Sequence, residues 1–273
     1  MKKQLIHLPT SLILIFISLN HVLAQPKVVV LGSVHFPTQK VNADSLFNIL
    51  QKFKPDIILL EADSSNFYDD FTFKHLYDEN EYIATVRYKM KNPLVNIRPI
   101  EFEGRNSYRK SIGIYPEAGP VWQKLNQLNN EKKFNKEEQK IWDELAYLDS
   151  VASAYKNASL QSINQPKIDQ IINNLIISKY LSIKKIVDTN PVFAESKLID
   201  AKKDTVTMRQ YFALWANFEG NLRNNAIASN VMKQIKLNPE KKIIVITGFY
   251  HRPFILNKLA ENKIPTHEFY QIK

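Results

Sequence analysis

Two short apolar runs, one near each end of the chain, share the same order of hydrophobic and polar positions. The segments Lys27–His35 (KVVVLGSVH) and Lys242–His251 (KIIVITGFYH) both begin with lysine, continue in aliphatic, mostly β-branched residues, and close with a glycine followed three residues later by a histidine. Such a run predicts a buried β-strand that carries an imidazole just beyond its carboxyl end. We expect the protein to be organised around the place where these two strand ends meet.

A helical pattern and a second apolar run follow the first strand. Asn42 can cap a helix that Pro55 ends, and the apolar positions of this helix fall on one face (Leu46, Ile49, Leu50 and Phe53). The next strand is predicted at Asp56–Glu61, and a third one, also ending in carboxylates, at Asn96–Glu103. A strand, a helix and a mostly apolar strand in this order indicate a right-handed βαβ unit of a parallel sheet.

The remainder of the chain is mainly helical in pattern. The stretch from Pro120 to about Pro191 carries helical apolar stripes and no strand candidate, so we interpret it as an insertion or cap over the sheet. The other expectations are helices over Asn66–Tyr88, Met208–Leu237 and Phe254–Ala260, mobile connections at Asn157–Pro166 and Lys197–Thr207, and a last strand at Thr266–Tyr270. The predicted fold class is α/β: a mostly parallel central sheet flanked by helices, in a single domain over residues 25–273, with a helical insertion at about 120–191.

The first 24 residues have the composition of a secretory signal peptide. Lys2 and Lys3 form a basic start, Leu12–Leu19 is a short apolar run, and Ala24 is a small residue before the expected cleavage point. The apolar run is too short for a stable membrane span. We therefore expect an exported protein, periplasmic or secreted after cleavage near Ala24. The chain has no cysteine, which excludes disulfides, a thiol nucleophile and thiolate metal sites.

The formal net charge is +10, and the lysines that produce it are scattered as short pairs along the chain. Pairs of this kind on amphipathic helices are typical of solvated faces, and no nucleic-acid-binding motif accompanies them. We expect no nucleic-acid partner. A weak attraction to anionic substrates is compatible with this charge.

Chemically active side chains stand at the carboxyl ends of the predicted strands, where open parallel sheets bind ligands. They are His35, Glu61, His251 and a carboxylate from Glu101 or Glu103. His35, Glu61 and His251 suit Zn²⁺, Mn²⁺ or Co²⁺ with one open position for water, and this water would attack an ester, lactone, amide or peptide carbonyl. Without a metal, a histidine–glutamate pair can still activate water. We expect these three residues and Glu101 to be catalytic.

Three further residues are expected to contact the substrate. They are Arg105, Arg223 and Tyr250, which follow a strand end or lie on the helix before the second Gly-x-x-His motif. An arginine that faces the strand ends can hold a substrate carboxylate. The spacing also allows Arg223 to form a structural ion pair with Glu219.

These motifs together resemble the TraB/Tiki superfamily, which includes erythromycin-esterase-like and ChaN-like haem-binding proteins. The residues that carry the resemblance are Gly32–His35, Glu61, Gly248–His251, a helical pattern formed by Arg223, Ile227-Ala228 and Asn230, and the segments Leu31–Pro37 and Lys52–Pro55. Asn224 stands where an acidic residue is usual in the family. The resemblance covers both ends of the mature chain and leaves out the stretch from Pro120 to Pro191.

The resemblance implies several activities, because members of the superfamily include metal-dependent proteases, lactone hydrolases and haem binders. Our leading interpretation is an exported hydrolase of a small-molecule or peptide substrate. The alternative is a non-catalytic binder of haem or a peptide, for which aromatic residues near the motifs are available (Phe36, Phe67, Tyr68, Phe249 and Tyr250). A third interpretation is that the histidines only fix loops by hydrogen bonds.

Overall fold

The computed structural model describes residues 28–75 and 77–272. The predicted signal peptide lies outside these residues. Within them, no helix combines the length and the apolar character that crossing a membrane requires.

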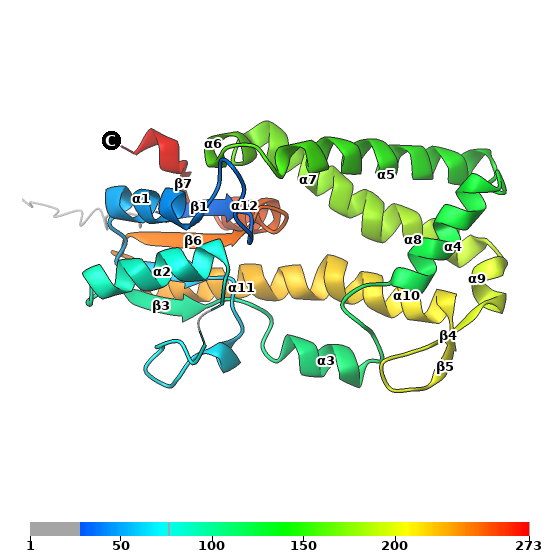
Figure 1. Cartoon of the computed structure of the whole chain (residues 1–273), viewed down its shortest axis with the longest axis horizontal. Coiled ribbons are helices and arrows are strands. Elements are labelled where there is room, and N and C mark those ends of the chain that lie inside the picture. Colours follow the sequence, from blue (N-terminus) through cyan, green and yellow to red (C-terminus); the bar gives the residue numbers. More distant parts are fainter. Residues whose placement is uncertain (1–27, 76, 273) are drawn as a thin grey trace, which may run out of the picture.

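A five-stranded sheet in the order β3-β2-β6-β1-β7 forms one end of the molecule, and all its neighbouring strands are parallel (Figure 1). The strands are β1 (Val28–Ser33), β2 (Ile57–Leu60), β3 (Asn96–Pro99), β6 (Ile243–Gly248) and β7 (Thr266–His267). The predicted α/β fold with a parallel central sheet is confirmed. Strand β6 comes late in the sequence but lies between β1 and β2, so the two strands that precede the Gly-x-x-His histidines are direct neighbours.

Helices cover both faces of this sheet, because its strands are buried on both sides. Alternate residues of β1, β2 and β6 face α1 (Ala43–Phe53) and α2 (Asn80–Lys91) in one apolar cluster. The other residues of these strands face α11 (Arg223–Leu237) and α12 (Arg252–Glu261) in a second cluster. Asn42 caps α1 in a capping box with Ser45, as the sequence predicts for this position.

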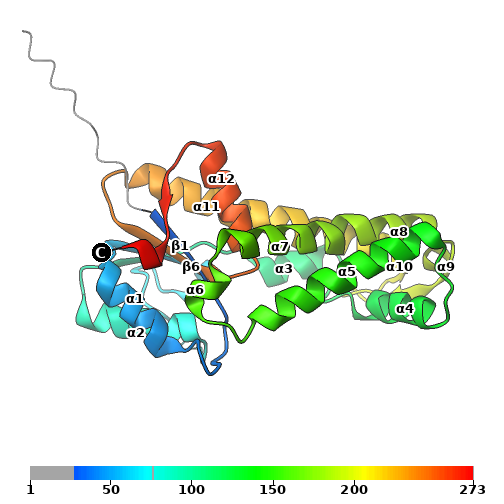
Figure 2. The same cartoon turned by 90° about the horizontal axis from the view of Figure 1, so that it is seen from above.

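A helical lobe extends from the carboxyl ends of the strands and makes the molecule elongated (Figures 1 and 2). It contains α4 (Gly119–Asn130), α5 (Lys136–Tyr155), α6 (Leu160–Ile163), α7 (Pro166–Ile177), α8 (Ile183–Thr189) and α9 (Val192–Glu195). Helix α10 (Met208–Asn217) belongs to the lobe and continues into α11, which covers the sheet. Because of this continuous helical run, the lobe and the sheet are joined by a helix as well as by loops.

Two π-helical segments interrupt the helices where the lobe meets the sheet. Segment η2 (Ser178–Ser182) joins α7 to α8, and segment η3 (Phe218–Leu222) joins α10 to α11. The segments pack against each other at Gly220, where an added Cβ would lie 2.6 Å from Cβ of Tyr180. Single π-helical turns inside α-helices occur frequently at functional sites.

Four parts of the chain differ from the sequence-based expectations. Asn66–Tyr88 is not one helix, because η1 (Ser64–Asn66) is followed by a loop and α2 begins only at Asn80. The rings of Phe67 and Phe73 close this loop, with centroids 4.7 Å apart. Lys197–Thr207 forms a hairpin of β4 (Lys197–Ile199) and β5 (Thr205–Thr207), because the Asp200 carboxylate accepts backbone bonds that close the turn. Strand β7 has only two residues and leads into η4 (Phe269–Gln271). Helix α3 (Arg105–Ser111), which follows β3, was not predicted from the sequence.

Candidate functional site

Four strand ends bring the predicted site residues to one edge of the sheet. His35 follows β1, Glu61 follows β2, Glu101 follows β3, and His251 follows β6. Because β6 pairs with both β1 and β2, Glu61 lies beside the end of β6, and the backbone N–H of Gly248 donates to its carboxylate at 2.7 Å. This edge is the place where the fold exposes loops for binding and catalysis.

Glu61 is contacted by residues of β6 and α11 and by His251, the residue before α12. Its Oε2 accepts bonds from the Thr247 hydroxyl at 2.6 Å and from the Gly248 amide, and its Oε1 lies 3.0 Å from Arg223 and 3.3 Å from His251 Nε2. Burial raises the pKa of this carboxyl, but attraction to His251, Arg223 and His35 and the Thr247 bond outweigh it and hold the pKa at about 2. Glu61 is therefore an ionised carboxylate.

His251 is held as a neutral imidazole. Its Nδ1 lies 2.6 Å from Oδ1 of Asn224, whose Nδ2 donates to the carbonyl of Glu219 at 3.1 Å, so the amide orientation is fixed. The hydrogen bond therefore runs from Nδ1–H of His251 to Asn224, and Nε2 keeps its lone pair. Burial lowers the pKa of His251 below its usual value. The sequence did not predict Asn224 as part of the site.

His35 is held in the opposite protonation state. Its Nδ1 lies 3.3 Å from Oε1 of Glu81, a buried residue in the first turn of α2. The hydrogen bond with Glu81 outweighs partial burial and raises the pKa of His35 to about 9. Asn80 fixes the loop that carries His35. Its backbone N–H donates to the His35 carbonyl and its side-chain Nδ2 donates to the Val34 carbonyl, each at 2.8 Å. His35 is thus an imidazolium at neutral pH, and no sequence motif pointed to Glu81 as its partner.

The arginines of the site are engaged with carboxylates. Arg223 donates to Glu101 at 2.6 Å and to Glu61 at 3.0 Å, and it lies 3.6 Å from Glu219. The ion pair with Glu219 that the spacing allows is therefore weaker than its pairing with Glu101. Arg105 also pairs with Glu101, at 2.6 Å, while 30% of its side chain stays exposed. Arg223 thus fixes two strand-end carboxylates, whereas Arg105 keeps donors available to a ligand.

Two cavities border this centre from different sides. A cavity of about 570 Å³ is lined by His35, Glu61, Arg105 and other polar residues, and one of about 330 Å³ is lined by His251, Tyr250 and others. Arg223 lines both cavities. Burial raises the pKa of Tyr250 to about 12, so its hydroxyl stays protonated and can donate to a ligand. The two imidazoles therefore line different cavities that share Arg223.

The residues suited to a metal ion differ in part from the predicted set. Within residues 28–75 and 77–272, the ligand atoms that lie within 4.8 Å of one another belong to His35, Glu79 and Glu81. Oε1 of the buried Glu81 carboxylate faces His35, and Oε2 has no hydrogen-bond partner among the described residues, which fits a cation ligand. The oxygens of Glu61 are already engaged, which weighs against a metal there. A metal held by His35, Glu61 and His251 stays a prediction.

The aromatic residues that suggested a haem-binding cleft do not gather at one place. Phe36 and Tyr68 have 69% and 57% of their surface exposed, whereas Phe67 is packed among the phenylalanines of the loop before α2. Phe249 is buried against Tyr250, with ring centroids 4.5 Å apart. Haem binding stays a prediction.

Glu103 is the remaining predicted site residue. Its carboxylate accepts a hydrogen bond from the Ser64 hydroxyl, and the residue lines the cavity of about 570 Å³. Among the described residues, Glu103 takes no part in the ion pairs that join Glu61, Glu101 and Arg223. Glu101, and not Glu103, is therefore the carboxylate that β3 contributes to the centre.

The comparisons with known proteins identify no family. No protein-family model matches the chain, and no curated protein matches it. Among solved structures, the chain is similar to an erythromycin esterase, a histidine-to-asparagine mutant of EreC in its open conformation, with a TM-score of 0.37 and 13% sequence identity. The match covers 92% of this chain and 71% of that chain, and a likeness of this degree carries no argument about activity. Membership of the TraB/Tiki superfamily stays a prediction.

Proposed function

We propose that the protein is a hydrolase that cleaves an ester bond of a small-molecule substrate with a histidine base and a histidine acid. The observation that carries this proposal is the arrangement of two imidazoles at neighbouring strand ends: His251 lies 2.6 Å from Asn224 and 3.3 Å from Glu61, and His35 lies 3.3 Å from Glu81. In these surroundings burial lowers the pKa of His251, and Glu81 raises that of His35. Groups whose surroundings drive their pKa values apart are the usual acid and base of an active site.

His251 acts as the general base. Its Nε2 takes a proton from a water molecule, and Glu61 at 3.3 Å stabilises the imidazolium that forms. The hydroxide adds to the ester carbonyl carbon and gives a tetrahedral intermediate. Asn224 keeps the Nδ1–H tautomer throughout, as a carboxylate does in a serine hydrolase triad.

His35 acts as the general acid. Its imidazolium stabilises the negative charge of the intermediate and donates a proton to the leaving alkoxide as the C–O bond breaks, so the products are a carboxylic acid and an alcohol. His251 then returns its proton to solvent, and His35 regains one. Arg223 holds Glu61 and Glu101 in place beside the reacting bond, and Arg105 contributes a donor to the substrate.

A divalent cation is the alternative source of positive charge. It would be held by His35, Glu79 and Glu81, in place of the His35 proton, and would supply Lewis-acid stabilisation of the developing oxyanion. The proton and the cation compete for the same ligand atoms, so binding of the cation would be favoured at higher pH.

The test compares ester hydrolysis by the wild type with that of H35A and H251A, with H267A as a matched control. His267 lies in β7 and is exposed, away from the strand ends that form the site. We expect kcat/KM to fall by about 10²- to 10⁴-fold in H35A and H251A, the range that one acid or base contributes, and to stay unchanged in H267A. Unchanged hydrolysis in H35A and H251A would exclude this assignment.

We also propose that the chain is exported and cleaved near Ala24, on the strength of its basic and apolar N-terminal sequence. Expression with its own N-terminus, followed by mass analysis of the protein from the medium or the periplasm, tests this. A protein that keeps residues 1–24 and stays in the cytosol would contradict it.

A further inference from the structure

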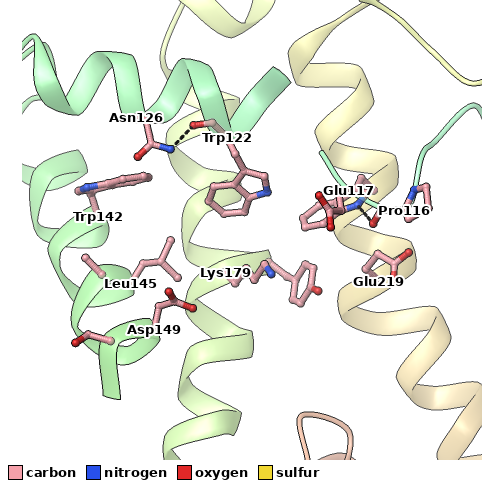
Figure 3. Close-up of a pocket in the computed structure, with 13 residues that line it drawn as sticks. Pro116, Glu117, Trp122, Asn126, Trp142, Leu145, Asp149, Lys179 and Glu219 are labelled. Atoms are coloured by element: carbon pink, nitrogen blue, oxygen red, sulfur yellow. Dashed lines mark hydrogen bonds between the residues drawn. The ribbon is translucent and has the colours of Figure 1, made fainter. Parts of the chain in front are cut away.

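A third cavity, of about 670 Å³, lies among the helices of the lobe (Figure 3). Trp122 lines it from α4, Trp142 from α5 and Trp215 from α10, and these are all the tryptophans of the chain. Trp122 and Trp215 also contact each other edge to face, with centroids 6.2 Å apart. Its volume and aromatic walls are those of a pocket for a small molecule.

The aromatic cavity is a neighbour of the candidate active site. Four residues line both this cavity and the one of about 330 Å³ that His251 lines: Asp149, Lys179, Tyr180 and Glu219. The two cavities are therefore adjacent along η2 and η3, the π-helical segments that contain Lys179, Tyr180 and Glu219. A molecule in the aromatic cavity therefore lies next to the cavity of His251.

The cationic side chain in the lining of this cavity is Lys179. Its ammonium extends into the pocket and lies 6.0 Å from the ring centroids of Trp122 and Trp215 (Figure 3). Within the described part of the chain, Lys179 forms no ion pair within 4.0 Å and no side-chain hydrogen bond. Burial lowers its pKa, and attraction to Asp149, Glu117 and Glu219 offsets this only in part.

Of the three carboxylates that line the cavity, one is paired within the protein and two are exposed to solvent. Glu219 pairs with Arg109 at 2.6 Å, so its charge is compensated inside the protein. Glu117 and Asp149 are exposed and stay in contact with solvent at the rim. A ligand in the cavity therefore meets aromatic surface, one partly buried cation and two solvent-exposed carboxylates.

We propose that this cavity is the binding pocket for the acyl or alcohol part of the substrate, and that this part is aromatic and carries an anionic group that pairs with Lys179. The inference rests on the proposed hydrolase function for the reacting end of the substrate. The pocket itself can be tested without catalysis, because its three tryptophans report occupancy by their fluorescence.

The experiment titrates the full mature chain with three naphthalene compounds of nearly the same size. They are 1-naphthaleneacetate, its uncharged amide, and 1-naphthylmethylammonium. We expect saturable quenching of tryptophan fluorescence by the acetate, with an affinity at least tenfold higher than that of the amide, and weaker quenching by the ammonium compound. Absence of saturable quenching would overturn the pocket, and equal affinities or preference for the ammonium compound would overturn the anionic assignment.

Variants of Lys179 separate charge from packing. In K179M the acetate should bind no better than the amide, whereas K179R should restore the preference, and K167M, at an exposed lysine of α7, should bind like the wild type. Retention of the wild-type preference in K179M would overturn the role of Lys179. Hydrolysis of mono-4-nitrophenyl esters of phenylenediacetic acids, which keep one free carboxylate, is measured in the same variants and in H251A and distinguishes the two proposals. Quenching without any hydrolysis would support the pocket and contradict the catalytic assignment.

Discussion

Replacement of Glu81 by glutamine tests the protonation of His35 directly. The buried carboxylate of Glu81, 3.3 Å from Nδ1, makes the largest contribution to the pKa of about 9 for His35, and glutamine has nearly the same shape without the charge. In E81Q the remaining influences are burial, which lowers the pKa, and weaker attraction to Glu61 and Glu79, which raises it. We expect the pKa of His35 to move from about 9 toward 6.5, its ordinary value.

The pH dependence of hydrolysis should show this change. In the wild type, activity rises as His251 loses its proton below pH 6.5 and falls as His35 loses its proton near pH 9, which gives a bell-shaped profile of kcat/KM. In E81Q the alkaline limb moves toward pH 6.5 by at least one pH unit, since 44% exposure of His35 leaves part of the effect to solvent screening. The profile narrows and its maximum falls.

The pH dependence of folding stability follows from the same shift in the pKa of His35. The folded-state pKa of His35 lies above its unfolded value, so the pair with Glu81 stabilises the fold fully below about pH 6.5, and this contribution disappears as pH rises through about 9. The difference in Tm between the wild type and E81Q should therefore become smaller between these pH values. An NMR titration of the His35 ring protons gives the pKa itself, and E79Q serves as a control because Glu79 has the smallest influence named above. A wild-type pKa near 6.5, or an unchanged alkaline limb in E81Q, would refute this reasoning.

Three further changes test other contacts of the site. In N224A the His251 tautomer is no longer fixed, so kcat should fall roughly 10- to 100-fold with little change in KM, and N224D should retain more activity; equal kcat in N224A and wild type would contradict this role. In G248A the added Cβ would lie 3.2 Å from Nε2 of His35, and the partly exposed imidazole can rotate away from it. We therefore expect kcat to fall while Tm changes little. A large loss of Tm with normal kcat would contradict this. After equilibration with Zn²⁺ or Mn²⁺, metal analysis should find the ion in the wild type and in H251A but not in E81Q. Loss of the bound ion in H251A would instead favour the ligand set predicted from the sequence.

The sequence predicted those parts of the site that follow from strand periodicity. The runs before His35, Glu61 and His251 are buried strands in the structure, and parallel pairing alone brings their ends to one edge. Glu81 and Asn224, which set the protonation of the imidazoles, belong to helices whose position depends on tertiary packing. Helical periodicity shows which face of a helix is buried but not which strand end that face meets.

Local turn chemistry explains the other differences. Residues 66–79 contain several aromatic residues at helix-like spacing, yet stacking of Phe67 on Phe73 closes a loop, and Phe71 takes a positive φ of 61° that a helix cannot contain. The two π-helical segments were not predicted either, because one extra residue in a helical turn leaves no distinct pattern of hydrophobic positions.

The position of β6 between β1 and β2 has a consequence for biosynthesis. When the first sixty residues leave the ribosome, the two strands they contain have no middle partner, and more than 180 residues must follow before that partner appears. Long-range pairing of this kind makes folding slow, and the unpaired edges invite association with other chains. A chain that stops before Ile243 lacks the centre of its sheet as well as His251, so chaperone dependence during synthesis is the expected cost of this topology.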